Sequence, residues 1–230
     1  MSAYSNLVIA DGAVGYWRLG ETSGTTAVDS VGGKNGTISG GVTLNQPGPL
    51  AEGSKAMVFD GASGGIQIGG VPDLLSTITL EAWINPTAGA VSCLYFASTQ
   101  PMRLRHFGAG SVHQFDVTIA GTTRSLQAGL VVANVWTHVV GTFDGTFMRL
   151  YVNGALLATS PSYPGAISAG QSPWWIGRYG SGLYFAGGVA EVALYPTALT
   201  AAQAAAHYIT GTAAATPSAW VPLAVAGVLR

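Results

Sequence analysis

The stretch from Trp136 to Gly154, WTHVVGTFDGTFMRLYVNG, limits the folds open to this chain more than any other. Apolar or small residues recur at every second position on both sides of an Asp-Gly pair: Val139, Gly141 and Phe143, then Met148, Leu150 and Val152. This period of two is typical of strands that pack one face on a core and leave the other face solvated. Asp144-Gly145 and Asn153-Gly154 are residue pairs that tight hairpin turns prefer. The stretch therefore predicts two antiparallel strands followed by a third.

Short runs of the same kind recur through most of the chain. They lie at 14–20, 55–60, 65–69, 78–84, 93–98, 113–121, 124–130, 173–178 and 187–195. The chain contains 33 Gly and 11 Pro, which suit the turns between such runs. About a dozen short strands separated by turns favour a sandwich of two sheets over a helical or α/β fold. We expect an all-β fold, an antiparallel jelly roll of two sheets.

One helix is expected near the C-terminus, across a sheet edge. Thr200 and Gln203 form a capping-box pattern, residues 201–210 are rich in alanine, and Gly211 is placed to end the helix. We therefore predict one domain over residues 1–211 and an extended tail over 212–230.

The tail ends in apolar residues that are too few and too interrupted to span a membrane. We expect it to be an assembly arm that contacts a neighbouring subunit, which makes the protein a homo-oligomer. The alternative is a tail folded back on its own sheet. The predicted contact residues are Trp220, Val221, Leu223, Val225 and Leu229.

Charge excludes two classes of partner. Only 8% of the residues are charged, and nine Lys and Arg against ten Asp and Glu leave a net charge of −1. No basic field is available to attract nucleic acid or an anionic membrane.

The first residues lack the basic and apolar regions of a secretion signal, so export by that route is not expected.

Several motifs in order carry a resemblance to a known family. They are YWRLGE (16–21), VDSVGGKNGTI (28–38), MVFDG (57–61), TLEAWI (79–84), the hairpin above, WIGRY (175–179) and VAEVALYPTALTAAQ (189–203). With these motifs the chain resembles the laminin G-like, concanavalin A-like jelly rolls, in the branch near the pentraxins. The resemblance implies that the hairpin is central scaffold and that His138 is a core residue, not a catalytic one.

The resemblance also implies one calcium ion at the sandwich edge. Hard cations need several carboxylate or carbonyl oxygens on loops. Asp29 and Asn35 lie in the matching loop, and Glu191 lies where relatives carry two acids, the first of which is Ala190 here. The alternative makes Asp29 and Asn35 turn residues that bond the nearby backbone.

Catalysis is the less favoured interpretation. Glycoside hydrolysis needs two carboxylates about 5 to 10 Å apart. Glu81, Asp116 and Glu191 each stand alone on their predicted strands, so a pair would have to converge from distant strands. The motifs of serine hydrolases, zinc proteases and phosphate loops are absent from the sequence.

The segment PWWIGRYGSGLYF (173–185) is the best candidate for sugar recognition, which combines aromatic faces with a few polar groups. Alternation places Trp174 with Ile176 in the core and turns the next residue outward. The predicted ligand-binding residues are Trp175, Arg178, Tyr179 and Tyr184. The alternative is that these side chains pack on neighbouring strands or a partner chain.

A second polar strand face is predicted from Arg103, Arg105 and His106, and we expect it to be solvated.

Together these features predict a non-catalytic binding or adhesion module whose ligand is a cell-surface glycan or a partner protein. Such relatives usually act outside cells, yet this chain shows no secretion signal. We therefore expect a phage virion protein of the tail or the capsid decoration, assembled in the host cytoplasm, or otherwise a protein of the extracellular surface. The alternatives are a purely structural decoration subunit without glycan binding and a polysaccharide-degrading enzyme.

Overall fold

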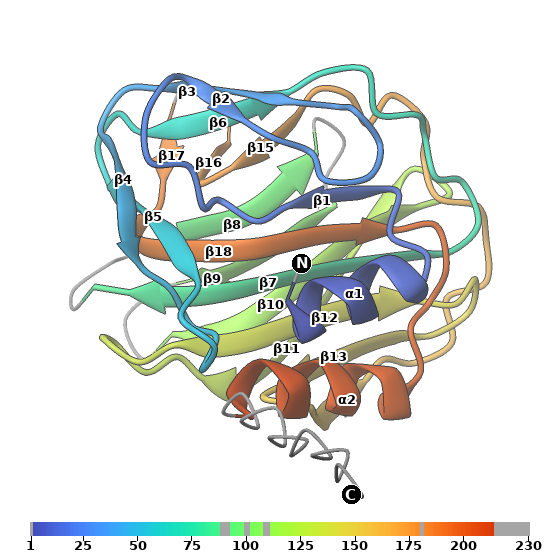
Figure 1. Cartoon of the computed structure of the whole chain (residues 1–230). Helices are drawn as coiled ribbons and strands as arrows, with labels where there is room; N and C mark the ends of the chain where they lie inside the picture. Colours follow the sequence, from blue (N-terminus) through green and yellow to red (C-terminus); the bar gives the residue numbers. More distant parts are fainter. Residues whose placement is uncertain (1, 88–92, 99–101, 108–110, 180–181, 214–230) are drawn as a thin grey trace, which may run out of the picture.

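The computed structural model describes residues 2–87, 93–98, 102–107, 111–179 and 182–213, and it consists of two stacked antiparallel sheets (Figure 1). Sheet A has the order β14 (Ala155–Thr159), β13 (Met148–Val152), β12 (Thr137–Phe143), β7 (Ile78–Pro86), β18 (Ala186–Tyr195), β5 (Lys55–Asp60) and β4 (Val42–Pro47), and β1 (Gly15–Trp17) also pairs with β18. Sheet B has the order β11 (Thr122–Leu130), β10 (Val112–Ile119), β9 (Arg103–Phe107), β8 (Cys93–Ser98), β15 (Trp174–Ile176), β6 (Gly65–Ile68), β3 (Gly36–Ser39) and β2 (Thr26–Ala27). A small ribbon pairs β16 (Arg178–Tyr179) with β17 (Leu183–Tyr184). The predicted all-β sandwich is confirmed.

The predicted hairpin is β12 and β13. Val139 pairs with Val152, Gly141 with Leu150 and Phe143 with Met148, so the predicted inward residues face one another in register. Asn153 and Gly154 both have positive φ, at 49° and 76°, as a tight two-residue turn requires. The Asp144-Gly145 turn differs, because only Gly145 has positive φ. There the Asp144 carboxylate accepts hydrogen bonds from the amides of Thr146 and Phe147.

The main core fills the space between the sheets. Its largest fully buried members are Trp17 of β1, Phe59 of β5, Phe96 of β8, Phe115 of β10, Phe143 of β12 and Trp174 of β15. Gly141 must be a glycine here, because a Cβ atom on it would lie 2.5 Å from the Phe115 ring on the opposite sheet. The two sheets therefore approach each other closely at this point.

The outer face of sheet A is covered, not solvated as predicted. Two helices, α1 (Ala3–Ala10) and α2 (Ala201–Thr212), lie across it in Figure 1. Tyr4 and Val8 of α1 pack with Trp83 of β7 in a second apolar cluster, and Ala204 of α2 packs in a third. The prediction of a single helix is therefore wrong, whereas α2 does contact β14, the edge strand of sheet A, as expected. In the described part of the chain, neither helix has the length and apolarity to cross a membrane.

Gly211 does not end the last helix. The capping box of Thr200 and Gln203 starts α2 as predicted, but the helix continues to Thr212. Gly211 is buried, and a Cβ atom on it would lie 2.6 Å from the ring of Trp83. Close packing of α2 on sheet A is thus the reason for this glycine. The five predicted contact residues between 220 and 229 lie outside the described residues.

Candidate functional site

Trp175 lies on the outer face of sheet B, as the alternation predicted. Its neighbours Trp174 and Ile176 are fully buried in the main core, whereas Trp175 is only half-buried. The ring of Tyr179, on the adjoining ribbon, meets Trp175 edge to face, with 5.9 Å between the ring centroids and 75° between the planes. The two aromatic residues therefore form one unit.

Arg103 and Arg105 of β9 join these aromatic residues on the same face. The Arg103 guanidinium lies 5.0 Å from the centre of the Tyr179 ring. Both arginines are enclosed, with 17% and 14% of their side chains exposed. We call Trp175, Tyr179, Arg103, Arg105 and Asp116 the sheet B platform. The sequence suggested two separate surfaces, and the structure makes them one.

His106 was predicted on the polar face of β9 and does not lie there. It is fully buried and contacts Phe185 of the main core, with 6.2 Å between the ring centroids. Since side chains alternate along a strand, His106 faces inward where Arg103 and Arg105 face outward. The prediction of a solvated face is also wrong for the two arginines, because they are mostly enclosed.

Asp116 holds the polar half of the platform in place. Its Oδ2 atom lies 2.9 Å from Arg105 Nε and 3.9 Å from Arg103 Nε. Its Oδ1 atom accepts hydrogen bonds from Gln114 Nε2 at 2.6 Å and Ser125 Oγ at 2.7 Å. Asp116 itself is fully buried, so it acts as an internal anchor for side chains around it. These partners of Asp116 could not be predicted from the sequence.

Gln127 of β11 extends the same row of polar groups. Its Nε2 donates to Gln114 Oε1 at 2.7 Å, and Gln114 in turn donates to Asp116. The row thus has a fixed direction, and Gln127 at its end is exposed. Such prepositioned amides and guanidinium groups can bind the hydroxyl groups of a ligand without first having to be ordered.

The other two predicted ligand residues, Arg178 and Tyr184, face each other across the β16–β17 ribbon. The Arg178 stem crosses Gly65 of β6, where a Cβ atom would lie 2.2 Å from Arg178 Cδ. Both side chains are half-buried. Arg178 precedes Tyr179 in β16, and Tyr184 pairs with Arg178, so both belong to the ribbon that carries Tyr179.

Asp29 and Asn35 stabilise a turn. Asp29 Oδ1 accepts the amides of Tyr16 and Val31 at 2.9 and 3.1 Å, and its Oδ2 accepts the amide of Lys34 at 2.9 Å. Asn35 Oδ1 accepts the Asp29 amide at 2.9 Å. These contacts agree with the turn interpretation of the two residues.

Glu191 has different partners from Asp29 and Asn35. It lies at a bulge in β18, with φ of 51°, and is buried. The Tyr16 hydroxyl donates a hydrogen bond to it, and Arg18 Nε lies 3.7 Å away. Burial raises the pKa of Glu191 to about 7. Within the ranges that the structure describes, no three His, Cys, Asp or Glu side chains gather as metal ligands. Calcium at this loop stays a prediction.

Asp29→Ala is expected to lower the free energy of unfolding by about 1 to 3 kcal/mol, because it leaves buried amides without an acceptor. The loss should be equal in chelator and in calcium when measured by urea unfolding. Asp29→Asn, which keeps one oxygen acceptor, should lose less. A loss that appears only in the presence of calcium would instead identify Asp29 as a calcium ligand.

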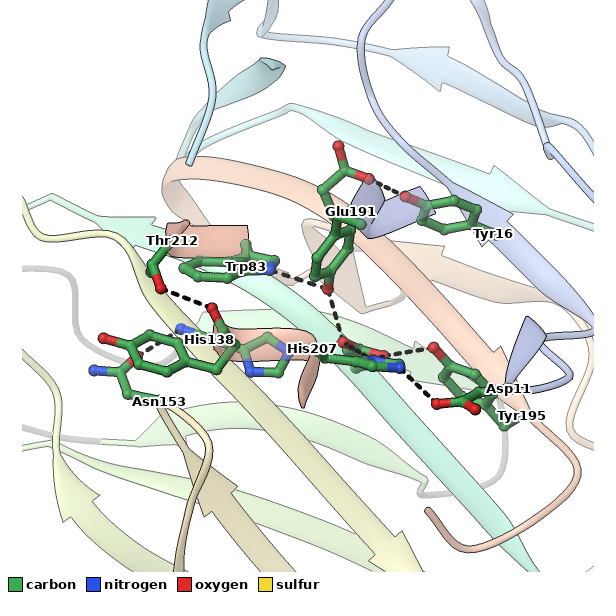
Figure 2. A network of polar contacts seen from close by, with 12 residues as sticks. Asp11, Tyr16, Trp83, His138, Asn153, Glu191, Tyr195, His207 and Thr212 are labelled. Atoms are coloured by element: carbon green, nitrogen blue, oxygen red, sulfur yellow. Dashed lines mark hydrogen bonds and ion pairs between the residues drawn. The ribbon is translucent and has the colours of Figure 1, made fainter. Parts of the chain in front are cut away.

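Glu81 of β7 is the centre of a dense buried polar network, of which Figure 2 shows Tyr195, His138 and His207. Its carboxylate accepts from the Tyr4 hydroxyl at 2.7 Å, the Tyr195 hydroxyl at 2.6 Å, His138 Nε2 at 2.7 Å and His207 Nδ1 at 2.9 Å. His138 is fully buried, so its interpretation as a core residue is confirmed.

The network contains an enclosed ion pair. Burial on its own would raise the pKa of Glu81, but His207 and the hydrogen bonds from both histidines lower that pKa below its usual range. Burial likewise would lower the pKa of His207, yet Glu81 and Asp11 raise it. His207 Nε2 lies 2.9 Å from Asp11 Oδ2. Glu81 and His207 are fully buried. The network therefore connects the helices to sheet A and is not an open reaction site.

The two stacked antiparallel sheets define the class of this protein as a β-sandwich of the jelly-roll type. The family model described as the Concanavalin A-like lectin/glucanases superfamily (Laminin_G_3) matches residues 60–205, and the chain belongs to this family. The narrower relation to the pentraxins stays a prediction. None of the curated proteins matches the sequence.

Solved structures share the fold at low sequence identity. Domain 4 of AbnA, an extracellular GH43 arabinanase from Geobacillus stearothermophilus in complex with arabinotriose, has a TM-score of 0.61 and 20% identity, covering 86% of this chain and 98% of that one. The ligand binding domain of botulinum neurotoxin serotype D in complex with N-acetylneuraminic acid has a TM-score of 0.65 and 14% identity, covering 90% and 52%. The binding domain of Paraclostridial Mosquitocidal Protein 1 has a TM-score of 0.64 and 14% identity, covering 88% and 52%. The chain thus spans about half the length of these two toxin chains.

Proposed function

We propose that the protein is a non-catalytic carbohydrate-binding module that holds its ligand on the sheet B platform. The observation that carries the proposal is the Trp175–Tyr179 pair beside a polar row fixed by Asp116. Sugars present apolar faces that stack on aromatic rings and hydroxyl groups that need oriented partners. The platform supplies both within one surface.

The state of Asp116 and Glu81 favours binding over hydrolysis at the platform and beneath the helices. A glycosidase needs one carboxyl group free to donate a proton and another free to attack or to activate water. Both oxygens of Asp116 are engaged by Arg105, Gln114 and Ser125, and Glu81 is sealed beneath the helices. The similar arabinanase domain and toxin domain were solved with arabinotriose and N-acetylneuraminic acid, which supports a sugar as the ligand class.

Trp175→Ala is expected to weaken glycan binding by roughly tenfold to a hundredfold, since tryptophan side chains at the centre of a binding surface contribute strongly. A glycan array would find the ligand, and calorimetry would compare the variants. Trp136→Ala is the matched control, because Trp136 is also half-buried but packs against the second apolar cluster beneath α1. Undiminished binding by Trp175→Ala, with the melting temperature retained, would refute the platform as the site.

We also propose that the protein works as a homo-oligomer in a virion, as a tail or capsid decoration protein, attached through its C-terminal segment. Ile209 of α2 is 63% exposed just before that segment begins. Apolar surface of this kind is stabilised when a neighbouring subunit covers it. In this setting the segment of residues 214–230 contributes to assembly and not to the stability of the sandwich.

Deletion of residues 214–230 is expected to abolish oligomerisation while leaving the melting temperature of the monomer unchanged. Light scattering and thermal unfolding measure the two properties separately. A truncated protein that assembles normally but melts several degrees lower would show that the segment packs on its own domain. The substitution Ile209→Ser tests the neighbouring surface and should weaken assembly without affecting glycan binding.

A further inference from the structure

The sheet B platform carries a surplus of positive charge in a chain that has little charge elsewhere. The whole protein has nine Lys and Arg, and three of them, Arg103, Arg105 and Arg178, lie on the platform or on the ribbon beside it. Among the described residues, the carboxylate that pairs with Arg105 and more distantly with Arg103 is that of Asp116. One internal negative charge therefore faces a larger positive one.

From this arrangement we infer that the platform selects acidic saccharides, which carry a carboxylate, over neutral ones. The inference rests on the proposed function and specifies its ligand class. A carboxylate accepts paired hydrogen bonds from a guanidinium group, and such charge-assisted contacts are about twice as strong as neutral ones. A neutral sugar would cover the arginines without compensating their charge.

The position of the arginines favours this role. Asp116 Oδ2 lies 2.9 Å from Arg105 Nε but 3.9 Å from Arg103 Nε, so it compensates the charge of Arg103 less than that of Arg105. Arg103 lies over the Tyr179 ring, and Tyr179 touches Trp175. A sugar ring stacked on Trp175 would therefore have its substituents beside the Arg103 guanidinium.

The enclosure of these arginines strengthens the effect. With 17% and 14% of their side chains exposed, Arg103 and Arg105 have lost most of their contact with water. Charges interact more strongly where water is excluded. A ligand carboxylate can replace the lost hydration, whereas a neutral ligand that displaces the remaining water leaves a charge uncompensated. The platform thus disfavours neutral sugars as well as favouring acidic ones.

The test uses a panel of oligosaccharides that contain uronic or sialic acid, each printed beside its own methyl ester. Esterification removes the charge and keeps the ring, its stereochemistry and its hydroxyl groups. The acids should bind about tenfold more tightly than their esters, which is the effect of one charge-assisted contact. This preference should shrink when NaCl rises from about 0.05 M to about 0.5 M, because salt screens the attraction.

Two arginine variants separate a local contact from general charge. Arg103→Gln should bring the affinity for an acid close to that for its ester. Arg124→Gln is the matched control, because Arg124 also lies over a tyrosine, Tyr163 at 4.6 Å, but on the opposite face of sheet B to the platform, paired with buried Val117. The Arg124→Gln variant should prefer acids over esters as strongly as the natural protein does.

Each outcome of the panel is decisive. Equal binding of acids and esters, without a response to salt, would overturn the acidic ligand class and leave the proposed glycan binding in place. Binding of neutral sugars alone would do the same. No binding to any saccharide on the panel or on a neutral array would overturn the proposed function together with the inference.

Discussion

Glu81→Ala is expected to lower the free energy of unfolding by about 3 to 5 kcal/mol, the range found when one partner of a buried charge network is removed. The reason is that Tyr4, Tyr195, His138 and His207, all fully buried, lose their acceptor. With Glu81 removed, Asp11 alone would oppose the burial that lowers the pKa of His207. Unfolding in urea, followed by circular dichroism, measures the loss.

Two further glutamate variants make this result interpretable. Glu81→Gln keeps an oxygen acceptor but removes the charge, so its loss should lie between those of the natural protein and Glu81→Ala. Glu52→Ala removes an exposed glutamate and should change the stability by less than about 0.5 kcal/mol. If Glu81→Ala unfolds at the same urea concentration as the natural protein, the network does not stabilise the fold.

Leu150→Ala should cost about 2 to 5 kcal/mol, because it opens a cavity between the sheets. Leu150 is fully buried in the main core, opposite Gly141. Arg149→Ala is the adjacent control, since Arg149 is half-buried on the other face and pairs with Asp144 at 2.6 Å. A partly exposed pair of this kind contributes about 1 kcal/mol or less. Equal small losses in both variants would contradict the assignment of inner and outer faces.

The strands were predictable because their signals are local. Residues 55–60 and 93–98 were predicted with the bounds that β5 and β8 have, and the Asn153-Gly154 turn has the expected backbone. Helix α1 was missed because AYSNLVIA has no charges and only a weak contrast between an apolar and a polar face. Its stability comes instead from Tyr4 and Val8, which pack against sheet A. Such long-range packing cannot be predicted from the local sequence of the helix.

The candidate site was predictable only in part, because some of its contacts join residues that are far apart in the sequence. Alternation alone turned Trp175 outward, since it depends on two adjacent residues. Trp175 lies on the same surface as Arg103 and Arg105 because sheet B has the strand order β9, β8, β15. This order brings together segments that are far apart in the sequence. Glu81 did carry a usable signal, an acid at an outward position of an apolar strand, but its meaning required the helices that cover it.

The placement of α1 and α2 has a consequence for multivalent display. The two helices contact each other through Asp11 and His207 on the outer face of sheet A, the side of the sandwich away from the platform (Figure 1). A carrier joined through either helix therefore leaves the platform unobstructed. Copies fixed side by side on one surface would point their platforms the same way, so that weak single contacts add up to avidity through high effective concentration.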